Sequence, residues 1–148
     1  MLNSENQVLD ISQIEEFALT FSKKLQVGDI VLLKGELGSG KTTISRFIIN
    51  HLYSLNNLKR PLAISSPSYP ILLTYELGSF DIYHYDLFRI KDIKELFDLD
   101  FLENINNSIS LIEWPEILLN SSFQQKYYLL ELQIKSDLKR IINIKYYQ

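Results

Sequence analysis

The sequence predicts a three-layer α/β domain built on a mixed β-sheet whose centre is parallel, and three observations predict it. A short apolar run at 30–34 is followed by a glycine-rich loop and then by a helical pattern. A second apolar run lies at 108–113, and two alternating runs follow it. This order of elements is typical of a sheet covered by helices on both faces. We expect a single domain over 1–148.

Composition and charge limit the classes of protein and partner. The chain has 148 residues, a net charge of −3 and no cysteine. It therefore has no disulfide framework and no thiolate metal site, which favours a cytoplasmic protein. No apolar run is long enough to span a bilayer, and the N-terminus does not resemble a signal peptide. No cluster of lysine and arginine marks a nucleic-acid surface. If the function involves RNA, we expect a partner protein to bind it.

The remaining elements follow from periodicity, in chain order. Residues 12–25 carry apolar side chains at helical spacing, and Ser12 and Glu15 have the spacing of a capping box. A second helix follows the glycine-rich loop and runs to about Leu55. Further elements are expected as strands at 70–76 and 79–86, one or two short helices at 90–105, and strands at 126–135 and 140–147 joined through 136–137.

The glycine-rich loop carries the strongest motif. Glycine is scarce in the chain, with five in all, yet glycines crowd the segment 35–40. The segment 35–42, GELGSGKT, matches G-x-x-x-x-G-K-[ST] between a predicted strand and a predicted helix, as this phosphate-binding loop (P-loop) requires. Such a loop binds phosphates with backbone N–H groups, Lys41 reaches the β- and γ-phosphates, and Thr42 binds Mg²⁺. The alternative is a glycine-rich turn that matches by chance.

Other segments narrow the class of P-loop protein. A GTPase would normally carry Asn-Lys-x-Asp and Asp-x-x-Gly; neither is present, and DLFR at 86–89 lacks the glycine. Small-molecule kinases usually close an arginine-bearing lid over the phosphate. The arginines of this chain are scattered, at Arg46, Arg60, Arg89 and Arg140. This scatter weakens the interpretation as a small-molecule kinase, which stays as one alternative. The other alternative is a nucleotide-dependent binding module with negligible turnover.

Two carboxylates are predicted at the carboxyl ends of strands. Glu113 ends an apolar strand at the edge where open α/β sheets bind ligands, so it would hold Mg²⁺ opposite Thr42. The alternative is an exposed glutamate at the end of a strand, which would be the better interpretation of Glu113 if the sequence had no P-loop motif. Asp86 shares a strand face with His84 and would orient or deprotonate a water, or cap the strand. Trp114, the only tryptophan, either packs in the core or covers the site.

Four blocks together resemble a known family. In order they are GELGSGKTT, SPSYPILLTYE, IYHYDLFRI and LIEWPE, all within 27–116. The chain resembles the bacterial TsaE (YjeE) ATPases, which take part in forming threonylcarbamoyladenosine on tRNA. The resemblance implies a P-loop NTPase-like domain that hydrolyses ATP with Mg²⁺. It also implies a partner complex of the TsaB–TsaD type, which performs the transfer, so that tRNA is reached only through that complex.

The resemblance also implies roles for individual residues. Lys41 and Asp86 would serve hydrolysis, and Thr42 and Glu113 would bind Mg²⁺. The residues implied to contact the nucleotide are Glu36, Leu37, Gly38, Ser39, Gly40, Lys41, Thr42, Thr43 and Trp114. SPSY, at 66–69, would act as a switch-like loop near the γ-phosphate, with Ser68 where the family usually has threonine. Ile14 stands about where relatives place a threonine near the adenine, so no base-reading residue is assigned.

Overall fold

Residues 3–148, which the computed structural model describes, form seven strands and five helices. The strands are β1 (Ser4–Asp10), β2 (Ile30–Gly35), β3 (Leu72–Glu76), β4 (Asp81–Asp86), β5 (Ser108–Glu113), β6 (Tyr127–Ser136) and β7 (Lys139–Tyr147). The helices are α1 (Ile11–Ser22), α2 (Lys41–Leu55), α3 (Ile93–Phe97), α4 (Phe101–Asn104) and α5 (Glu116–Leu119). Every element that the sequence predicts is present, and β1 and α5 are additional.

All seven strands join one sheet, in the order β1-β7-β6-β2-β5-β4-β3. Strand β2 runs parallel to β5 on one side and to β6 on the other, and β5 runs parallel to β4. The pairs towards the two edges are antiparallel. The predicted fold class, α/β with a mixed sheet and a parallel centre, is therefore confirmed. The parallel alignment brings the carboxyl ends of β2, β4 and β5 to one edge of the sheet, where open α/β sheets bind ligands.

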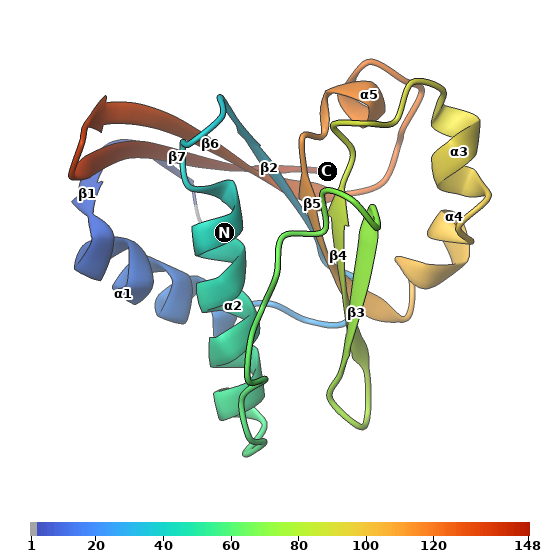
Figure 1. The fold of residues 1–148 in the computed structure, drawn as a ribbon, viewed down its shortest axis with the longest axis horizontal. Coiled ribbons are helices and arrows are strands. Elements are labelled where there is room, and N and C mark those ends of the chain that lie inside the picture. Colours follow the sequence, from blue (N-terminus) through green and yellow to red (C-terminus); the bar gives the residue numbers. More distant parts are fainter. Residues whose placement is uncertain (1–2) are drawn as a thin grey trace.

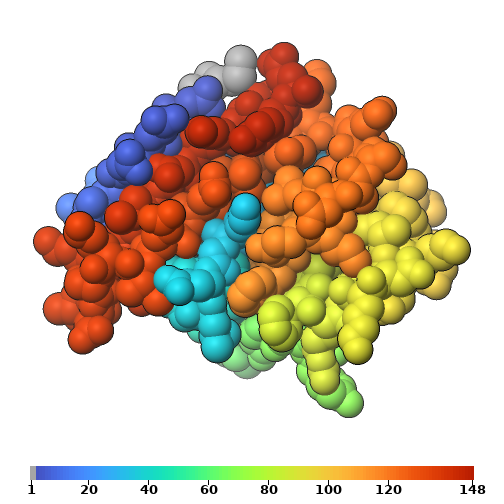
Figure 2. Space-filling view, turned by 90° about the horizontal axis from the view of Figure 1, so that it is seen from above, coloured from blue at the N-terminus to red at the C-terminus, as the bar shows by residue number. Residues whose placement is uncertain are grey.

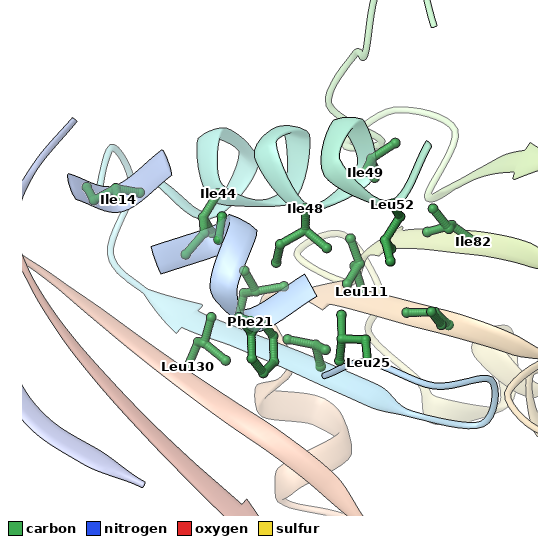
Figure 3. Close-up of a cluster of buried hydrophobic side chains, with 14 of the residues drawn as sticks. Ile14, Phe21, Leu25, Ile44, Ile48, Ile49, Leu52, Ile82, Leu111 and Leu130 are labelled. Atoms are coloured by element: carbon green, nitrogen blue, oxygen red, sulfur yellow. The ribbon is translucent and has the colours of Figure 1, made fainter. Parts of the chain in front are cut away.

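Two apolar clusters, one on each face of the sheet, hold the layers together. Helices α1 and α2 cover one face, and α3, α4 and α5 cover the other (Figure 1). Under α1 and α2, the cluster includes Phe21, Ile48 and Leu111 (Figure 3). On the opposite face Tyr85 and Phe101 pack edge to face, with ring centroids 5.4 Å apart. The central strands supply both clusters, because successive strand residues point to opposite faces.

The start of α1 differs from the prediction. Its N-cap is Asp10, whose Oδ1 accepts a hydrogen bond from the Gln13 amide at 2.9 Å, while Gln13 Oε1 accepts one from the Asp10 amide at 2.9 Å. The capping box predicted at Ser12 and Glu15 is therefore wrong. Ser12 lies inside the helix and donates its hydroxyl to Asp10 Oδ1. The helix begins earlier because β1 ends at Asp10 and leads directly into it.

The ends of the sheet depend on contacts between distant parts of the chain. Strand β1 pairs antiparallel with β7, with Val8 opposite Ile141. The turn between β6 and β7 consists of residues 137 and 138, one residue later than predicted.

Among the helices of residues 3–148, none has the length and apolar character needed to cross a membrane.

The capping of α1 can be tested by substitution. Asp10→Ala removes the acceptor for the Gln13 amide, so we expect a lower midpoint of urea unfolding. Asp10→Asn should keep most of the stability, because asparagine is an equally good N-cap. Ser12→Ala is the control and should have a smaller effect, since it removes only a donor to Asp10. Equal losses in Asp10→Ala and Ser12→Ala would show that Asp10 is not the cap.

Candidate functional site

A cavity of about 680 Å³ opens at the carboxyl edge of the parallel strands. One wall is the glycine-rich loop and the start of α2, which contribute Leu37, Gly38, Gly40, Lys41, Thr42 and Thr43. The ends of β4 and β5 with the segments that follow them form a second wall, and part of the segment that precedes β3 forms a third. From above, the glycine-rich loop (cyan) lies between the β6–β7 hairpin (red-orange) and these segments (yellow-green and orange) (Figure 2). The cavity thus occupies the edge where the sequence predicts a ligand.

Backbone geometry at the glycines shapes the loop. A Cβ on Gly35 would lie 2.4 Å from Ser39 Oγ and 2.6 Å from the Leu132 carbonyl oxygen, so a larger residue does not fit without displacing backbone. Gly40 is the N-cap of α2 with a φ of 107°, in the left-handed region that favours glycine. Among residues 3–148, no side chain caps the first amides of α2. These N–H groups and the helix dipole suit an anion.

Lys41 is buried beneath the loop and points into it. Its side chain is 5 % exposed, and Nζ donates to the carbonyl oxygens of Gly35 at 2.6 Å and Glu36 at 2.9 Å. Ser39 Oγ lies 3.5 Å from Nζ, at the limit of a hydrogen bond. Burial lowers the pKa of Lys41, an effect that the nearby Glu113 carboxylate opposes. An ammonium has three donors, so two strong bonds fix its position and leave capacity for an anion.

Thr42 and Glu113, predicted as metal ligands, are in direct contact. Thr42 Oγ1 donates to Glu113 Oε1 at 2.7 Å, and the other carboxylate oxygen, Oε2, lies 2.5 Å from His84 Nε2. Glu113 is only 2 % exposed, which excludes the alternative of an exposed strand-end residue. Sequence reasoning left His84 without a role. Its contact with Glu113 joins two strands, and no local pattern reports it.

The donor set suits Mg²⁺ bound together with phosphate. Thr42 and Glu113 offer a hydroxyl and a carboxylate, the hard oxygen ligands that Mg²⁺ prefers. Within residues 3–148 no three His, Asp or Glu side chains form a metal cluster of their own. Mg²⁺ usually takes only one or two carboxylates, and water and substrate phosphates complete its octahedron. The residues present therefore fit this ion next to an anion held by the loop.

Asp86 lies at the end of β4, directly opposite Glu113 in the parallel pairing of β4 with β5. It lines the cavity but is only 4 % exposed, and its Oδ1 accepts a hydrogen bond from the Phe88 amide at 2.9 Å. Burial raises the pKa of Asp86, an effect that the Phe88 amide opposes and the Glu113 carboxylate reinforces. A buried carboxylate on the wall of a cavity can accept a proton or orient a water.

Trp114 belongs to the cavity rather than to the core. It is half-buried, and its ring centroid lies 3.9 Å from Lys41 Nζ and 4.8 Å from the Phe88 ring centroid. Its φ is 54°, in the left-handed region that non-glycine residues rarely adopt. This backbone turn directs the indole over Lys41, where a cation–π contact covers the ammonium. Of the two positions that the sequence left open, the one at the site is correct.

The SPSY segment closes another side of the cavity, with Ser66, Ser68 and Tyr69 on its wall. Arg46 of α2 ties the preceding loop down, because its Nε donates to the Ile64 carbonyl at 2.7 Å. The Arg89 guanidinium lies 5.0 Å from the centre of the Tyr69 ring. The segment predicted to act as a switch therefore lies beside the loop and the two carboxylates.

Two of the predicted contact residues do not present side chains to the cavity. Glu36 is exposed and takes part through its carbonyl oxygen, which accepts from Lys41. Ser39 is fully buried, and its hydroxyl lies against Gly35 instead of the cavity. For both, any contact with a ligand would come from the backbone.

Comparison with known proteins identifies the family. The model of a family described as threonylcarbamoyl adenosine biosynthesis protein TsaE matches residues 8–142. The chain belongs to the TsaE family. The TsaE protein of Rickettsia typhi is 38 % identical over 144 residues, which are 97 % of this chain and 92 % of that protein. TsaE of Borreliella burgdorferi is 33 % identical, over 80 % of this chain and 82 % of that protein.

A solved structure supports the same fold. The crystal structure of Bacillus subtilis YdiB superposes with a TM-score of 0.64, at 18 % identity, over 97 % of this chain and 87 % of that one. At this identity the likeness concerns the arrangement of strands and helices.

A smaller groove in this TsaE-family chain adjoins the loop. Its volume is about 390 Å³, and it shares Gly38, Gly40 and Thr43 with the larger cavity. Ile14 and Arg140 also line it, and Arg140 Nη2 donates to the Gly38 carbonyl at 3.2 Å. Sequence reasoning missed Arg140, because a residue on β7 shows no local sign of reaching a loop about a hundred residues earlier.

The buried charge of Asp86 should reduce stability in a pH-dependent way. A raised pKa means that the folded protein disfavours the charged form of Asp86. The resulting loss of stability is absent below the pKa of Asp86 in the unfolded state and complete above its pKa in the folded state. Asp86→Asn removes the charge and keeps an oxygen for the Phe88 amide. We expect a higher urea midpoint than that of the parent at pH 7, and a difference that vanishes below about pH 3.9.

Asp81→Asn, at the other end of β4, is the matched control and should leave the midpoint nearly unchanged. A loss of stability in Asp86→Asn at pH 7 would mean that the carboxylate serves the fold.

Proposed function

We propose that this chain binds and hydrolyses ATP with Mg²⁺ as a subunit of the machinery that makes threonylcarbamoyladenosine on tRNA. The observation that carries the proposal is the convergence of Lys41, Thr42, Asp86 and Glu113 on one cavity. Membership of the TsaE family supports the link to tRNA modification, since the related proteins are named for that biosynthesis. The P-loop motif supports ATP as the ligand.

The proposed roles follow from the contacts of each residue. Backbone amides from Glu36 to Thr43 bind the phosphates, and Lys41 supplies the positive charge, because the loop carbonyls hold its ammonium in place. Thr42 and Glu113 would hold Mg²⁺, which would supply positive charge to offset that of the phosphates. Trp114 shields Lys41 from water, which strengthens its interaction with an anion.

Asp86 is the proposed group for orienting the attacking water. Asp86 lies on the cavity wall, beside the β5 end that carries Glu113. The raised pKa of Asp86 brings it closer to neutral pH, which favours acceptance of a proton from a water attacking the γ-phosphate. The smaller groove next to the loop leaves room for the base, with Ile14 and Arg140 on its wall.

The proposed partner is a protein complex of the TsaB–TsaD type, which performs the transfer itself. The net charge of −3 argues against direct binding of tRNA by this chain, because nucleic-acid surfaces are normally basic. The proposed compartment is the cytoplasm, which the absence of cysteine from the sequence favours.

A reconstitution tests the whole proposal. Candidate partner proteins, tRNA, ATP, threonine and bicarbonate are combined with this chain, and modified adenosine is counted by mass spectrometry of the digested tRNA. We expect multiple turnovers with the parent chain and near-complete loss with Lys41→Ala, which removes the phosphate-binding charge. Lys24→Ala, an exposed residue near the end of α1, should be as active as the parent.

Each other outcome contradicts a stated part of the proposal. Full activity of Lys41→Ala would mean that the nucleotide binds elsewhere. A phosphorylated small molecule would indicate a kinase, and tRNA modification without ATP turnover would indicate a nucleotide-dependent binding module.

The role of Asp86 has its own test. A group that orients water acts mainly in the transition state, so its loss should lower kcat and leave ATP binding intact. General-base help contributes about 10² to 10⁴ in rate, so we expect Asp86→Asn to hydrolyse ATP at least about tenfold more slowly. Titration calorimetry with Mg²⁺ and a non-hydrolysable ATP analogue checks the binding, and Asp81→Asn is the control. Unchanged kcat in Asp86→Asn would rule out this role.

A further inference from the structure

A buried histidine lies behind the proposed metal ligands. His84, on β4, is 0 % exposed, and its Nε2 lies 2.5 Å from Oε2 of Glu113, which is 2 % exposed. It points to the α2 face of the sheet, as do Ile82 and Asp86, because alternate residues of a strand share a face. Unlike Asp86, His84 is not part of the cavity wall that residues 3–148 form, so it does not meet the ligand space directly.

The imidazole makes this one polar contact. A carboxylate oxygen accepts hydrogen bonds, so the tautomer that binds Glu113 is the one in which Nε2 is the donor. The other ring nitrogen, Nδ1, is buried and finds no hydrogen-bond partner within residues 3–148. Burying a polar ring with one nitrogen unsatisfied costs stability, and an apolar side chain could pack at this position without that cost. The contact with Glu113 is therefore the feature that distinguishes histidine from an apolar residue here.

The contact determines how the Glu113 carboxylate is presented. Oε2 is occupied by His84, and Oε1 accepts from Thr42 Oγ1 at 2.7 Å. With both oxygens held by hydrogen bonds, the carboxylate cannot rotate freely about its last bond. Oε1 is the oxygen that remains next to the Thr42 hydroxyl and the cavity.

We propose that His84 is a positioning residue for Mg²⁺. It holds Oε2 of Glu113, so that Oε1 faces Thr42 in the orientation that Mg²⁺ bound with nucleotide requires. The proposal rests on the proposed function of the site, and it assigns His84 no contact with nucleotide or metal. Residues that orient a metal ligand typically change metal affinity about 10- to 100-fold when they are lost.

Three variants separate this role from a purely structural one. His84→Leu removes the donor and keeps an apolar side chain, whereas His84→Gln places an amide nitrogen near the position of Nε2. Ile82→Ala is the control: Ile82 is fully buried on the same face of the same strand, in the apolar cluster under α2. It perturbs the packing of β4 but not the Glu113 carboxylate.

The measurement is how strongly the binding of the non-hydrolysable analogue AMP-PNP depends on Mg²⁺. Titration calorimetry gives this binding, at a temperature well below the thermal unfolding midpoint of each variant. For His84→Leu we expect the Mg²⁺ concentration at half-maximal enhancement to rise about 10- to 100-fold, with unchanged affinity in EDTA. His84→Gln should restore much of the Mg²⁺ dependence, and Ile82→Ala should match the parent. No turnover is needed for this readout.

The outcomes distinguish this inference from the proposed function. If His84→Leu and Ile82→Ala both keep the parent Mg²⁺ dependence while Thr42→Ala loses it, the metal site stands and His84 serves only the fold. If His84→Leu and Ile82→Ala lose it equally, the effect is one of packing, and the inference is wrong. If the parent binds AMP-PNP without any Mg²⁺ dependence, the metal site itself is wrong, and the inference falls with it.

Discussion

The Glu113 carboxylate connects the parts of this molecule that make the site. It ends β5 and contacts the first turn of α2 through Thr42 and β4 through His84. A carboxylate buried to this degree destabilises a fold unless hydrogen bonds compensate for its lost water. The two contacts can form only when β5 lies between β2, which leads into the loop and α2, and β4. The strand order and the site therefore depend on the same interaction.

Other features of the cavity reduce stability, and the apolar layers compensate for them. Asp86 is buried with a raised pKa, Lys41 is buried with a lowered one, and Trp114 has a left-handed backbone. Such features cluster at functional sites and persist only where the surrounding structure holds them in place. Here two buried clusters, one under α1 and α2 and one under the short helices, fix the strands from which these residues extend.

The sequence predicts what local patterns determine. Apolar runs, helical spacing and the GELGSGKT loop report on neighbouring residues, and they correctly predict the parallel centre. They also indicate that Thr42 and Glu113 lie opposite each other at one edge of the sheet, where the two side chains are in contact. The pairing of β1 with β7 and the contact of Arg140 with the loop join residues more than a hundred positions apart. The contact of His84 with Glu113 is diagonal across two strands, because Leu111 lies directly opposite His84 and Glu113 lies opposite Asp86. Periodicity alone could therefore predict the face on which His84 lies but not its partner.

Charge gives the proposed site its final constraint. Asp86 and Glu113 place two carboxylates beside a loop that would hold phosphate, with Lys41 as the nearby buried cation. The negative charges of these two carboxylates would repel a triphosphate, and burial strengthens that repulsion because little water screens it. A divalent cation between Glu113 and the phosphates removes most of the conflict. Binding of metal and nucleotide would then be coupled, each raising the affinity for the other by the same factor. In the proposed site the Glu113 oxygens would transmit this coupling, so its strength would depend on how firmly Thr42 and His84 hold the carboxylate.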